Sequence, residues 1–303
     1  MKHFHFLCVL TVLFGLSAVA GANESQDADI NWAGCGITKK AFMAELAKAY
    51  EAKTGIKIGI AGGGATKGIR NAAAGNIDIG GACRTALDSR DDERDAHQIP
   101  VAWDALVVVV HKDNPVDNIT FDQLKQLYLG KLTNWKELGG QDAPIELYVR
   151  RGKMSGVGRT LRELVFNNFA QDFKAKHVVK SSGPLESAVE EEINAIAVTG
   201  ISSAKKRDFK ILKLNDYEPS YEHIKSGDYV LYRPLYLVTQ RSSTDPKVRD
   251  FIRYAVSNEG QEIIRQQGTV PYTEAMALVM KQLEQYDQAT ESGAYRTGTD
   301  GKI

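Results

Sequence analysis

The chain has 303 residues, of which 43% are apolar and 25% are charged, the balance of an ordinary globular protein. Lysine and arginine together number 38, as do aspartate and glutamate, so the formal net charge is zero and neither a nucleic-acid surface nor a polybasic membrane patch is expected. With only three cysteines and six histidines, the composition excludes a disulfide scaffold and a zinc site of four cysteines, and no HExxH motif occurs.

The first 22 residues are predicted to be a secretory signal peptide. Lys2 supplies a positive charge at the start, the stretch from Phe4 to Ala20 is almost wholly apolar, and small residues allow cleavage near Ala20 or Ala22. A membrane anchor is the alternative, but the apolar stretch is shorter than the roughly 20 residues that span a bilayer, and polar residues follow it. We therefore expect an exported, periplasmic protein without a membrane span.

After this leader, strand-like and helix-like segments alternate along the chain. Phe42, Leu46 and Tyr50 recur at helical spacing, whereas Leu106 to Val110 is the continuous apolar run expected of a buried parallel strand. The predicted strands are 30–33, 56–61, 77–79, 102–110, 145–150, 196–201 and 229–239. The predicted helices are 39–52, 66–74, 120–127, 158–169, 185–192, 248–256 and 275–286. This alternation predicts an α/β fold.

The chain is longer than one hydrophobic core usually serves, so two lobes are expected. The pattern breaks at 111–116 and again around Arg233 and Pro234, which we interpret as two crossings between lobes. The predicted division is a discontinuous first lobe, 27–112 plus 235–288, a second lobe, 113–234, and a flexible tail, 289–303. Two crossing strands would form a hinge.

Three segments place a loop of small residues between a strand and the start of a helix. These loops are 34–38, 62–66 and 153–156. A helix N-terminus exposes unpaired N–H groups with a partial positive charge, and glycine lets a ligand approach the backbone closely. Each loop alone is typical of an ordinary N-cap, which is the alternative interpretation. Together, with Arg150 and Arg151 before the third loop, they favour one shared anion site.

The motifs of common catalytic classes are absent. The chain lacks GxxxxGK[ST] and GxSxG, and Lys67 interrupts a GxGxxG pattern after Gly62. Ser155 has no histidine nearby in sequence, and no pair of carboxylates or metal-binding cluster is recognisable. We therefore expect a binding protein with no cofactor and no metal, and not an enzyme.

At these loops the chain resembles the periplasmic phosphate-binding proteins of ABC importers. The resemblance is carried, in order, by 34–38, 62–70, 78–84, 104–115, 119–140, 150–156 and 270–271, where 129–140 reads LGKLTNWKELGG. It implies a two-lobed type II periplasmic binding protein fold, with mixed, mostly parallel sheets, helices on both faces, and a cleft that closes on a tetrahedral oxyanion. It also implies a monomer that delivers its ligand to transporter subunits in the membrane.

The resemblance implies a set of ligand-binding residues. They are Thr38, Ala65, Thr66, Arg84, Arg151, Ser155 and Gly156. The chain departs from the family at 82–84, where some members have an acidic residue that accepts the proton of hydrogen phosphate, and at Val157, where a threonine is usual. Phosphate is the expected ligand, with sulfate, arsenate or a metalloid left open.

Cys35 and Cys83 are the cysteines outside the leader, and both lie in loops predicted to face the cleft. Three interpretations remain open: a disulfide formed after export, two separate buried thiols, or a site for a thiol-seeking metalloid. One alternative function is a sensory or accessory protein of the same fold that binds another oxyanion, or a metalloid through Cys35 and Cys83. The least favoured alternative, which does not depend on the cysteines, is a phosphatase-type enzyme.

Overall fold

The computed structural model describes residues 28–87 and 89–291. The predicted signal peptide and residues 292–303 of the predicted tail lie outside this part of the chain. Residues 289–291, which we assigned to the tail, belong to the last helix, α11 (Met276–Glu291).

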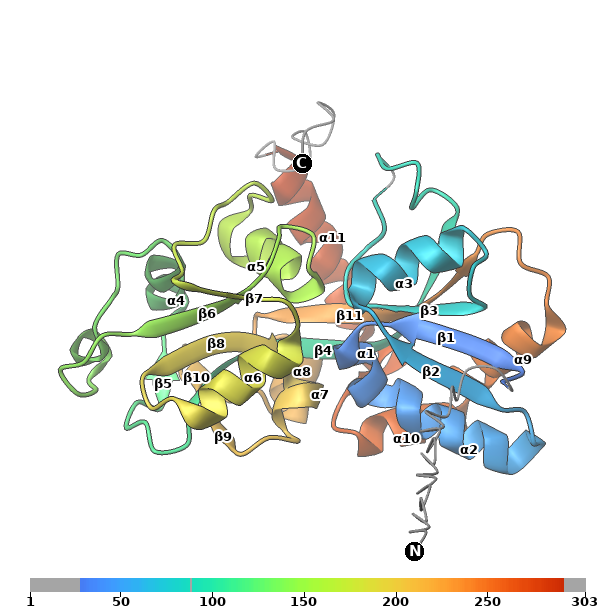
Figure 1. Cartoon of the computed structure of the whole chain (residues 1–303), viewed down its shortest axis with the longest axis horizontal. Coiled ribbons are helices and arrows are strands. Elements are labelled where there is room, and N and C mark those ends of the chain that lie inside the picture. Colours follow the sequence, from blue (N-terminus) through green and yellow to red (C-terminus); the bar gives the residue numbers. More distant parts are fainter. Residues whose placement is uncertain (1–27, 88, 292–303) are drawn as a thin grey trace, which may run out of the picture.

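Two α/β halves lie side by side (Figure 1), and the predicted two-lobed α/β fold is confirmed. The strands follow the order β2-β1-β3-β11-β4-β8-β6-β7. The first half contains β1 (Ile30–Gly34), β2 (Ile58–Gly62) and β3 (Ile79–Ala82), which pair in parallel. The second contains β6 (Glu146–Arg150), β7 (His177–Val179) and β8 (Ala195–Gly200), also parallel, with β9 (Phe209–Ile211) beside β4.

Helices surround the sheet in both halves. In the first half they are α1 (Gly36–Thr38), the π-helical η1 (Lys39–Met43), α2 (Ala44–Thr54), α3 (Gly64–Ala73), α9 (Pro246–Ala255) and α10 (Asn258–Gln266). In the second they are α4 (Phe121–Tyr128), η2 (Trp135–Leu138), α5 (Gly156–Phe166), α6 (Ser182–Glu191), α7 (Ile201–Ala204) and α8 (Tyr221–Ser226). Short elements complete the fold: β5 (Asn118–Ile119), β10 (Lys213–Leu214), β12 (Val270–Pro271) and η3 (Tyr272–Ala275).

Two long strands connect the halves, β4 (Ala96–His111) and β11 (Tyr232–Gln240), and they pair with each other in antiparallel register. The register shifts between Leu235 and Tyr236. The apolar run of β4 is buried as expected, but it pairs antiparallel with β8 and β9, so the prediction of a parallel strand was wrong. An apolar run reports burial on both faces of a strand and not the direction of its neighbours.

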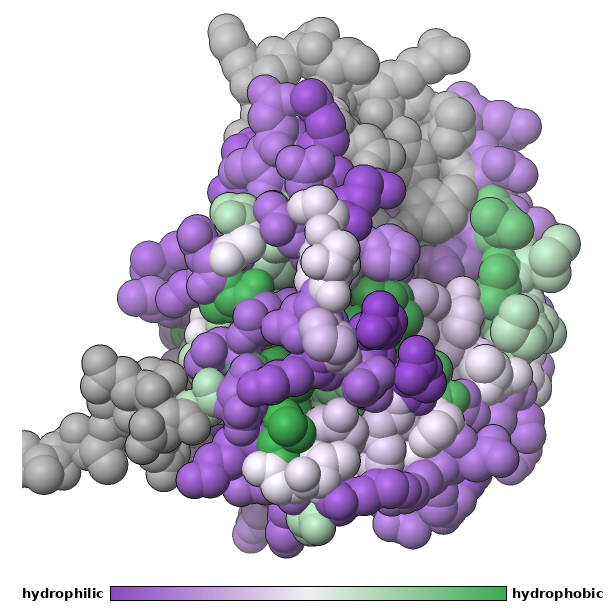
Figure 2. All heavy atoms as spheres, turned by 90° about the vertical axis from the view of Figure 1, so that its right-hand side faces the viewer, coloured by the Kyte–Doolittle hydropathy of each residue, from purple (hydrophilic) through white to green (hydrophobic). Residues whose placement is uncertain are grey.

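Side chains group into two hydrophobic cores, and β4 contributes to both. Val101 and Ala102 pack in the first core, whereas the strand from Trp103 to Val110 packs in the second, so the change occurs inside β4 rather than after residue 112. Val270 and Leu278, which our division assigned to the first lobe, also pack in the second core. The outer face of the first half is mainly hydrophilic, with hydrophobic residues in small groups (Figure 2). Within the described residues, no helix combines the length and hydrophobicity needed to cross a membrane.

Candidate anion-binding site

A cavity of about 650 Å³ lies between the two halves of the molecule. Residues of both halves line it: Cys35, Gly36, Lys40, Gly62, Gly63, Gly64, Ala65 and Cys83 from the first, and Arg150, Gly156, Val157, Lys180, Ser181, Ser182, Gly183, Ser203 and Arg207 from the second. Glycine, serine and basic residues dominate this lining, so backbone N–H groups and positive charges are accessible to a small guest.

Four helices in the described part of the chain begin at this cavity. Gly36 starts α1, which continues through η1 and α2 to Thr54, and Gly64 starts α3. Gly156 starts α5, and Ser182 starts α6. The first N–H groups of a helix have no partner within it and carry a partial positive charge, so four such ends around one cavity favour an anion.

Glycine is required where the chain turns into α3. Gly63 has φ 154° and Gly64 has φ 84°, which are backbone conformations that L side chains rarely adopt. A different device starts α5, where the Oγ of Ser155 accepts a hydrogen bond from the N–H of Gly158 at 3.1 Å. The cap satisfies the N–H of Gly158, whereas Gly156 and Val157 before it line the cavity, as Gly64 and Ala65 do at α3.

Arg150, the last residue of β6, lines the cavity just before the third loop. Its Nη1 donates to the Oγ of Ser182 at 2.6 Å, and its Nε is buried with no hydrogen-bond partner among the described residues. Burial lowers the pKa of Arg150 from its ordinary value, although the guanidinium stays charged at neutral pH. The side chain is therefore held in place and keeps donor capacity for a ligand.

Lys40 crosses between the halves at the edge of the cavity. Its Nζ donates to the Oγ of Ser203 at 2.7 Å and lies 3.3 Å from Oε2 of Glu186, which is fully buried. Arg207 also contacts this carboxylate, through Nε at 3.2 Å. On the other side, the Oγ1 of Thr66 donates to the carbonyl of Met154 at 3.1 Å. The contacts of Lys40 and Thr66 hold the two halves together around the cavity, whereas Arg207 and Glu186 pair within the second half.

The structure brings some of the expected ligand residues to the cavity and directs others elsewhere. Ala65 and Gly156 line it, with both cysteines. Ser155 caps α5, and Thr66 bridges to Met154. Thr38 is completely buried near the start of α1, and its Oγ1 has no hydrogen-bond partner among the described residues. The hydroxyl of Thr38 is therefore a buried polar group that the surrounding protein does not satisfy.

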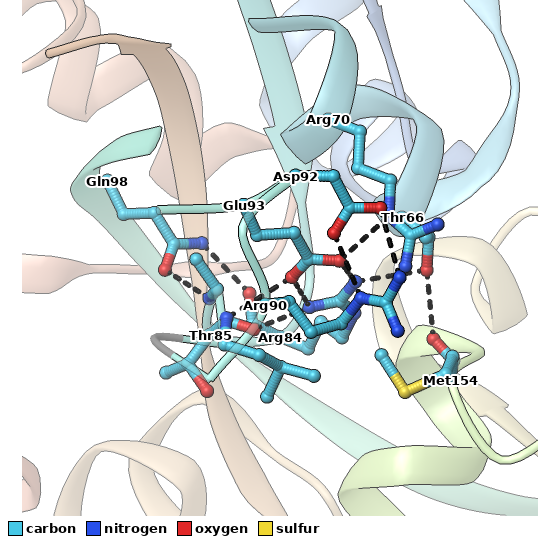
Figure 3. Close-up of polar contacts among 11 residues, drawn as sticks. Thr66, Arg70, Arg84, Thr85, Arg90, Asp92, Glu93, Gln98 and Met154 are labelled. Atoms are coloured by element: carbon cyan, nitrogen blue, oxygen red, sulfur yellow. Dashed lines mark hydrogen bonds and ion pairs between the residues drawn. The ribbon is translucent and has the colours of Figure 1, made fainter. Parts of the chain in front are cut away.

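Arg84 is held by an acidic residue (Figure 3). Its Nη1 and Nη2 donate to the two carboxylate oxygens of Glu93, each at 2.8 Å, and Nη2 also donates to Thr66 Oγ1 at 3.1 Å. Arg84 is only 4% exposed and Glu93 only 1%. The charge of Arg84 is thus paired inside the protein, and its side chain fixes Thr66 at the start of α3, while its expected role as a direct ligand stays a prediction.

Arg151, the other arginine expected to bind the ligand, lies at the surface. Its side chain is exposed and does not line the cavity, whereas its neighbour Arg150 does. Successive residues of an extended segment point to opposite faces, and the ladder continues here because the N–H of Arg151 donates to the carbonyl of Val179 at 2.8 Å. Of these two adjacent arginines, the alternation of side chains along the strand therefore directs Arg150 to the cavity and Arg151 to the surface.

The sequence analysis missed the start of α6 and the cations opposite it. Lys180, Ser181, Ser182 and Gly183 follow β7 directly. This is the same strand, small-residue loop and helix pattern that marked the other three loops, so the signal was present in the sequence. Lys40 and Arg207 carry no such local signal, because Lys40 reaches the cavity only through the approach of the two halves and Arg207 through its tertiary contacts with α6.

The buried carboxylate of Glu93 predicts how stability depends on pH. Burial raises its pKa, but the hydrogen bonds and charge of Arg84, with Arg70, outweigh burial and hold the pKa of Glu93 below its ordinary value of 4.5. A depressed pKa in the folded state stabilises the protein above the ordinary value, and this contribution is lost as pH falls through the folded-state pKa. Denaturant unfolding measured at pH 7, 4.5 and 3 should show that the free energy of unfolding falls less with decreasing pH for Glu93→Gln than for the parent protein. Equal losses would contradict this assignment.

Comparison with known proteins identifies the family. Residues 22–259 match the family model described as the PBP superfamily domain. The phosphate-binding protein PstS of Borreliella burgdorferi is 31% identical over 199 residues, covering 61% of this chain and 71% of that protein. The chain belongs to the PBP superfamily and is PstS-like.

Solved structures of PBP-superfamily proteins agree with this placement. A Clostridium perfringens protein, assigned as a phosphate ABC transporter substrate-binding protein and solved with bound phosphate, superposes with a TM-score of 0.72 at 28% identity, covering 80% of this chain and 98% of that chain. An ABC-type phosphate transport receptor from Vibrio cholerae superposes with a TM-score of 0.63 at 26% identity, covering 80% of this chain and 99% of that chain. The type II periplasmic binding protein architecture is thereby confirmed.

Among the described residues, no group of three or more histidine, cysteine or acidic side chains could hold a metal ion.

Proposed function

We propose that this PstS-like protein binds inorganic phosphate in the cavity between its halves and delivers it to the membrane subunits of an ABC importer. The observation that carries this proposal is the convergence of four helix N-termini and Arg150 on one cavity. The PstS proteins and the phosphate-bound structure to which the chain is similar support the choice of ligand.

Recognition would be by hydrogen bonding and charge, and no covalent bond changes. The N–H groups at Gly64 and Ala65, at Gly156, and at Ser182 would donate to the phosphate oxygens. Arg150 would supply the positive charge, while Lys40 and Arg207, partly balanced by Glu186, raise the local potential. We retain Thr38, Ala65, Thr66, Ser155 and Gly156 in the proposed ligand set and replace Arg151 by Arg150.

Titration calorimetry with phosphate, sulfate and arsenate tests the ligand. We expect saturable binding of phosphate to one site per chain, with arsenate as the nearest competitor because it is also a tetrahedral oxyanion. Absence of any heat with phosphate, in protein first unfolded and refolded to remove carried-over ligand, would contradict the proposal.

Delivery to a transporter and export are separate parts of the proposal. N-terminal sequencing tests export: the protein recovered from the periplasm should start at the residue after Ala20 or Ala22.

ATP hydrolysis tests delivery. The phosphate-loaded protein, acting as a monomer, should raise ATP hydrolysis by the reconstituted importer more than the phosphate-free protein does. Equal ATP hydrolysis with both forms would argue against the importer as partner.

Adding a methyl group at Gly156 should weaken phosphate binding. A Cβ at this position would lie 2.2 Å from the sulfur of Cys83 and 3.5 Å from the Cβ of Ala65, so the start of α5 has to move away from the first half. We expect Gly156→Ala to lower the affinity roughly tenfold, in line with about 1–3 kcal/mol for overpacking. Gly36→Ala adds the same methyl group at another helix start of the cavity, where its Cβ would meet no protein atom within 4 Å, so its effect should be smaller. Equal effects of the two variants, measured by calorimetry, would refute the steric explanation.

Thr38→Val tests whether the unpartnered hydroxyl serves the ligand. Valine keeps the shape and removes a buried oxygen that has no partner among the described residues, so the phosphate-free protein should keep its stability or gain about 1 kcal/mol. Phosphate affinity should fall roughly tenfold, the loss of one hydrogen bond to a charged oxygen. Thermal unfolding and calorimetry separate the two effects, and unchanged affinity would remove Thr38 from the site.

A further inference from the structure

Cys35 and Cys83 are free thiols at the anion cavity, and nothing in the proposed phosphate chemistry uses them. Their sulfur atoms lie 2.7 Å apart, in direct contact, and both residues are buried except where they meet the cavity. A pair of thiols in contact, facing a cavity that small molecules enter, is suited to reversible covalent chemistry.

The backbone holds this pair together. β1 and β3 are neighbouring parallel strands with Gly34 opposite Gly81, and the cysteines follow the two strand ends. The N–H of Cys35 donates to the carbonyl of Gly81 at 3.0 Å, which ties the first loop to the third strand. Bringing the sulfurs into bonding distance therefore needs side-chain movement and no rearrangement of the strands.

Cys35 also occupies the N-cap position of α1, one of the four helix starts at the cavity. The hydrogen bond from Cys83 lowers the pKa of the Cys35 thiol to about 6 against the effect of burial, and the charge of Arg233 and the N–H groups of Thr38 and Ile37 act in the same direction. The pKa of Cys83 is raised by that hydrogen bond and by burial. A negative charge on Cys35 in the reduced protein would therefore lie at the N-terminal end of α1, where it competes with the anion for the positive field of the helix.

We propose that Cys35 and Cys83 form a reversible disulfide in the anion site, and that the oxidised protein binds phosphate more tightly than the reduced protein. Oxidation removes the negative thiolate from the start of α1 and leaves its N–H groups to the ligand. The inference rests on the proposed function for the identity of the ligand, while the disulfide itself does not depend on it.

The oxidant is a small disulfide, such as oxidised glutathione. The Cys35 thiolate attacks one of its sulfurs, the oxidant's S–S bond breaks, and one thiolate leaves. Cys83 then loses its proton, and its sulfur attacks the sulfur of Cys35 in the mixed disulfide. The Cys35–Cys83 bond forms and the second thiolate leaves. Two electrons pass to the oxidant, and the proton of Cys83 passes to one of the released thiolates.

The pair is tested in the full chain equilibrated in glutathione and dithiothreitol redox buffers. Alkylation of the denatured protein and peptide mapping should locate a bond between Cys35 and Cys83, distinct from any bond to Cys8. Calorimetry should give a phosphate affinity about tenfold higher for the oxidised form, the scale of one charged hydrogen bond. Cys35→Ser should bind phosphate equally in oxidising and reducing buffer.

A second measurement needs no variant. Because coupling is reciprocal, saturating phosphate should stabilise the disulfide and move its midpoint potential to more negative values, by about 30 mV for each tenfold difference in affinity. Alkylation of both thiols after the most oxidising buffer would overturn the disulfide. Equal phosphate affinity of the two forms, with no shift in midpoint, would overturn the coupling. A protein that forms the disulfide but binds phosphate in neither state would contradict the proposed function and the coupling, while still supporting the disulfide site.

Discussion

Replacing Glu93 with alanine is expected to lower the free energy of unfolding by about 3–5 kcal/mol, the range for removing one partner of a buried ion pair. The carboxylate accepts two hydrogen bonds from Arg84, one from Nε of Arg70 at 3.1 Å and one from the N–H of Leu87 at 3.2 Å. Without it, the guanidinium of Arg84 is buried with an uncompensated charge. Chemical denaturation at pH 7 measures the loss.

Asp92 provides the matched control for Glu93. It is the adjacent acidic residue and also contacts Arg70, at 3.0 Å, but its side chain is 41% exposed. Asp92→Ala should therefore change the free energy of unfolding by less than about 1 kcal/mol. The double variant Arg84→Met with Glu93→Leu should recover part of the loss, since it removes both buried charges. If Glu93→Ala lowers the free energy of unfolding as little as Asp92→Ala does, the guanidinium of Arg84 becomes hydrated when Glu93 is removed, and the prediction is wrong.

Replacing Arg150 with methionine is expected to weaken phosphate binding roughly a hundredfold. A guanidinium can donate two hydrogen bonds to an oxyanion, each worth about 1.5–3 kcal/mol when charged groups are involved. Methionine keeps much of the side-chain volume but has no donor. The variant also loses the hydrogen bond to Ser182, so thermal unfolding is measured beside calorimetry to separate folding from binding.

Arg151→Met is the control for this experiment, because it removes the same charge one residue away. Arg151 is exposed and outside the cavity, so screened long-range attraction is its main contribution and the affinity should change less than about threefold. The reverse order, with Arg151→Met the more damaging variant, would restore the assignment made from the sequence and place Arg150 in a structural role.

The three small-residue loops were predictable because their chemistry is local. Gly62, Gly63 and Gly64 have few uses besides a sharp turn and close backbone approach, and the structure finds positive φ at the last two. The loop before α6 carries the same pattern in Lys180 to Gly183 and was predictable by the same argument. Local composition therefore located three of the four helix starts at the cavity, and the same argument could have located the fourth.

The side chains that cross the cavity were harder to predict. Whether Arg150 or Arg151 faces inward depends on the pleat of β6 at its last residue, and an uncertainty of one position in the strand reverses the answer. The role of Arg84 depends on Glu93, which no spacing rule links to it. Lys40 meets Glu186 only because two halves far apart in sequence pack together. Such contacts are properties of the tertiary structure.

The continuity of β4 and β11 has a mechanical consequence for ligand release. Two strands that remain hydrogen-bonded while passing from one core to the other resist free rotation, so separation of the lobes has to twist a ribbon of backbone. The ladder is weakest where its register slips between Leu235 and Tyr236, beside Pro234, which has no N–H to donate. Bending should therefore concentrate there, and the elasticity of this ribbon would restore the arrangement of the halves seen in this structure after each release.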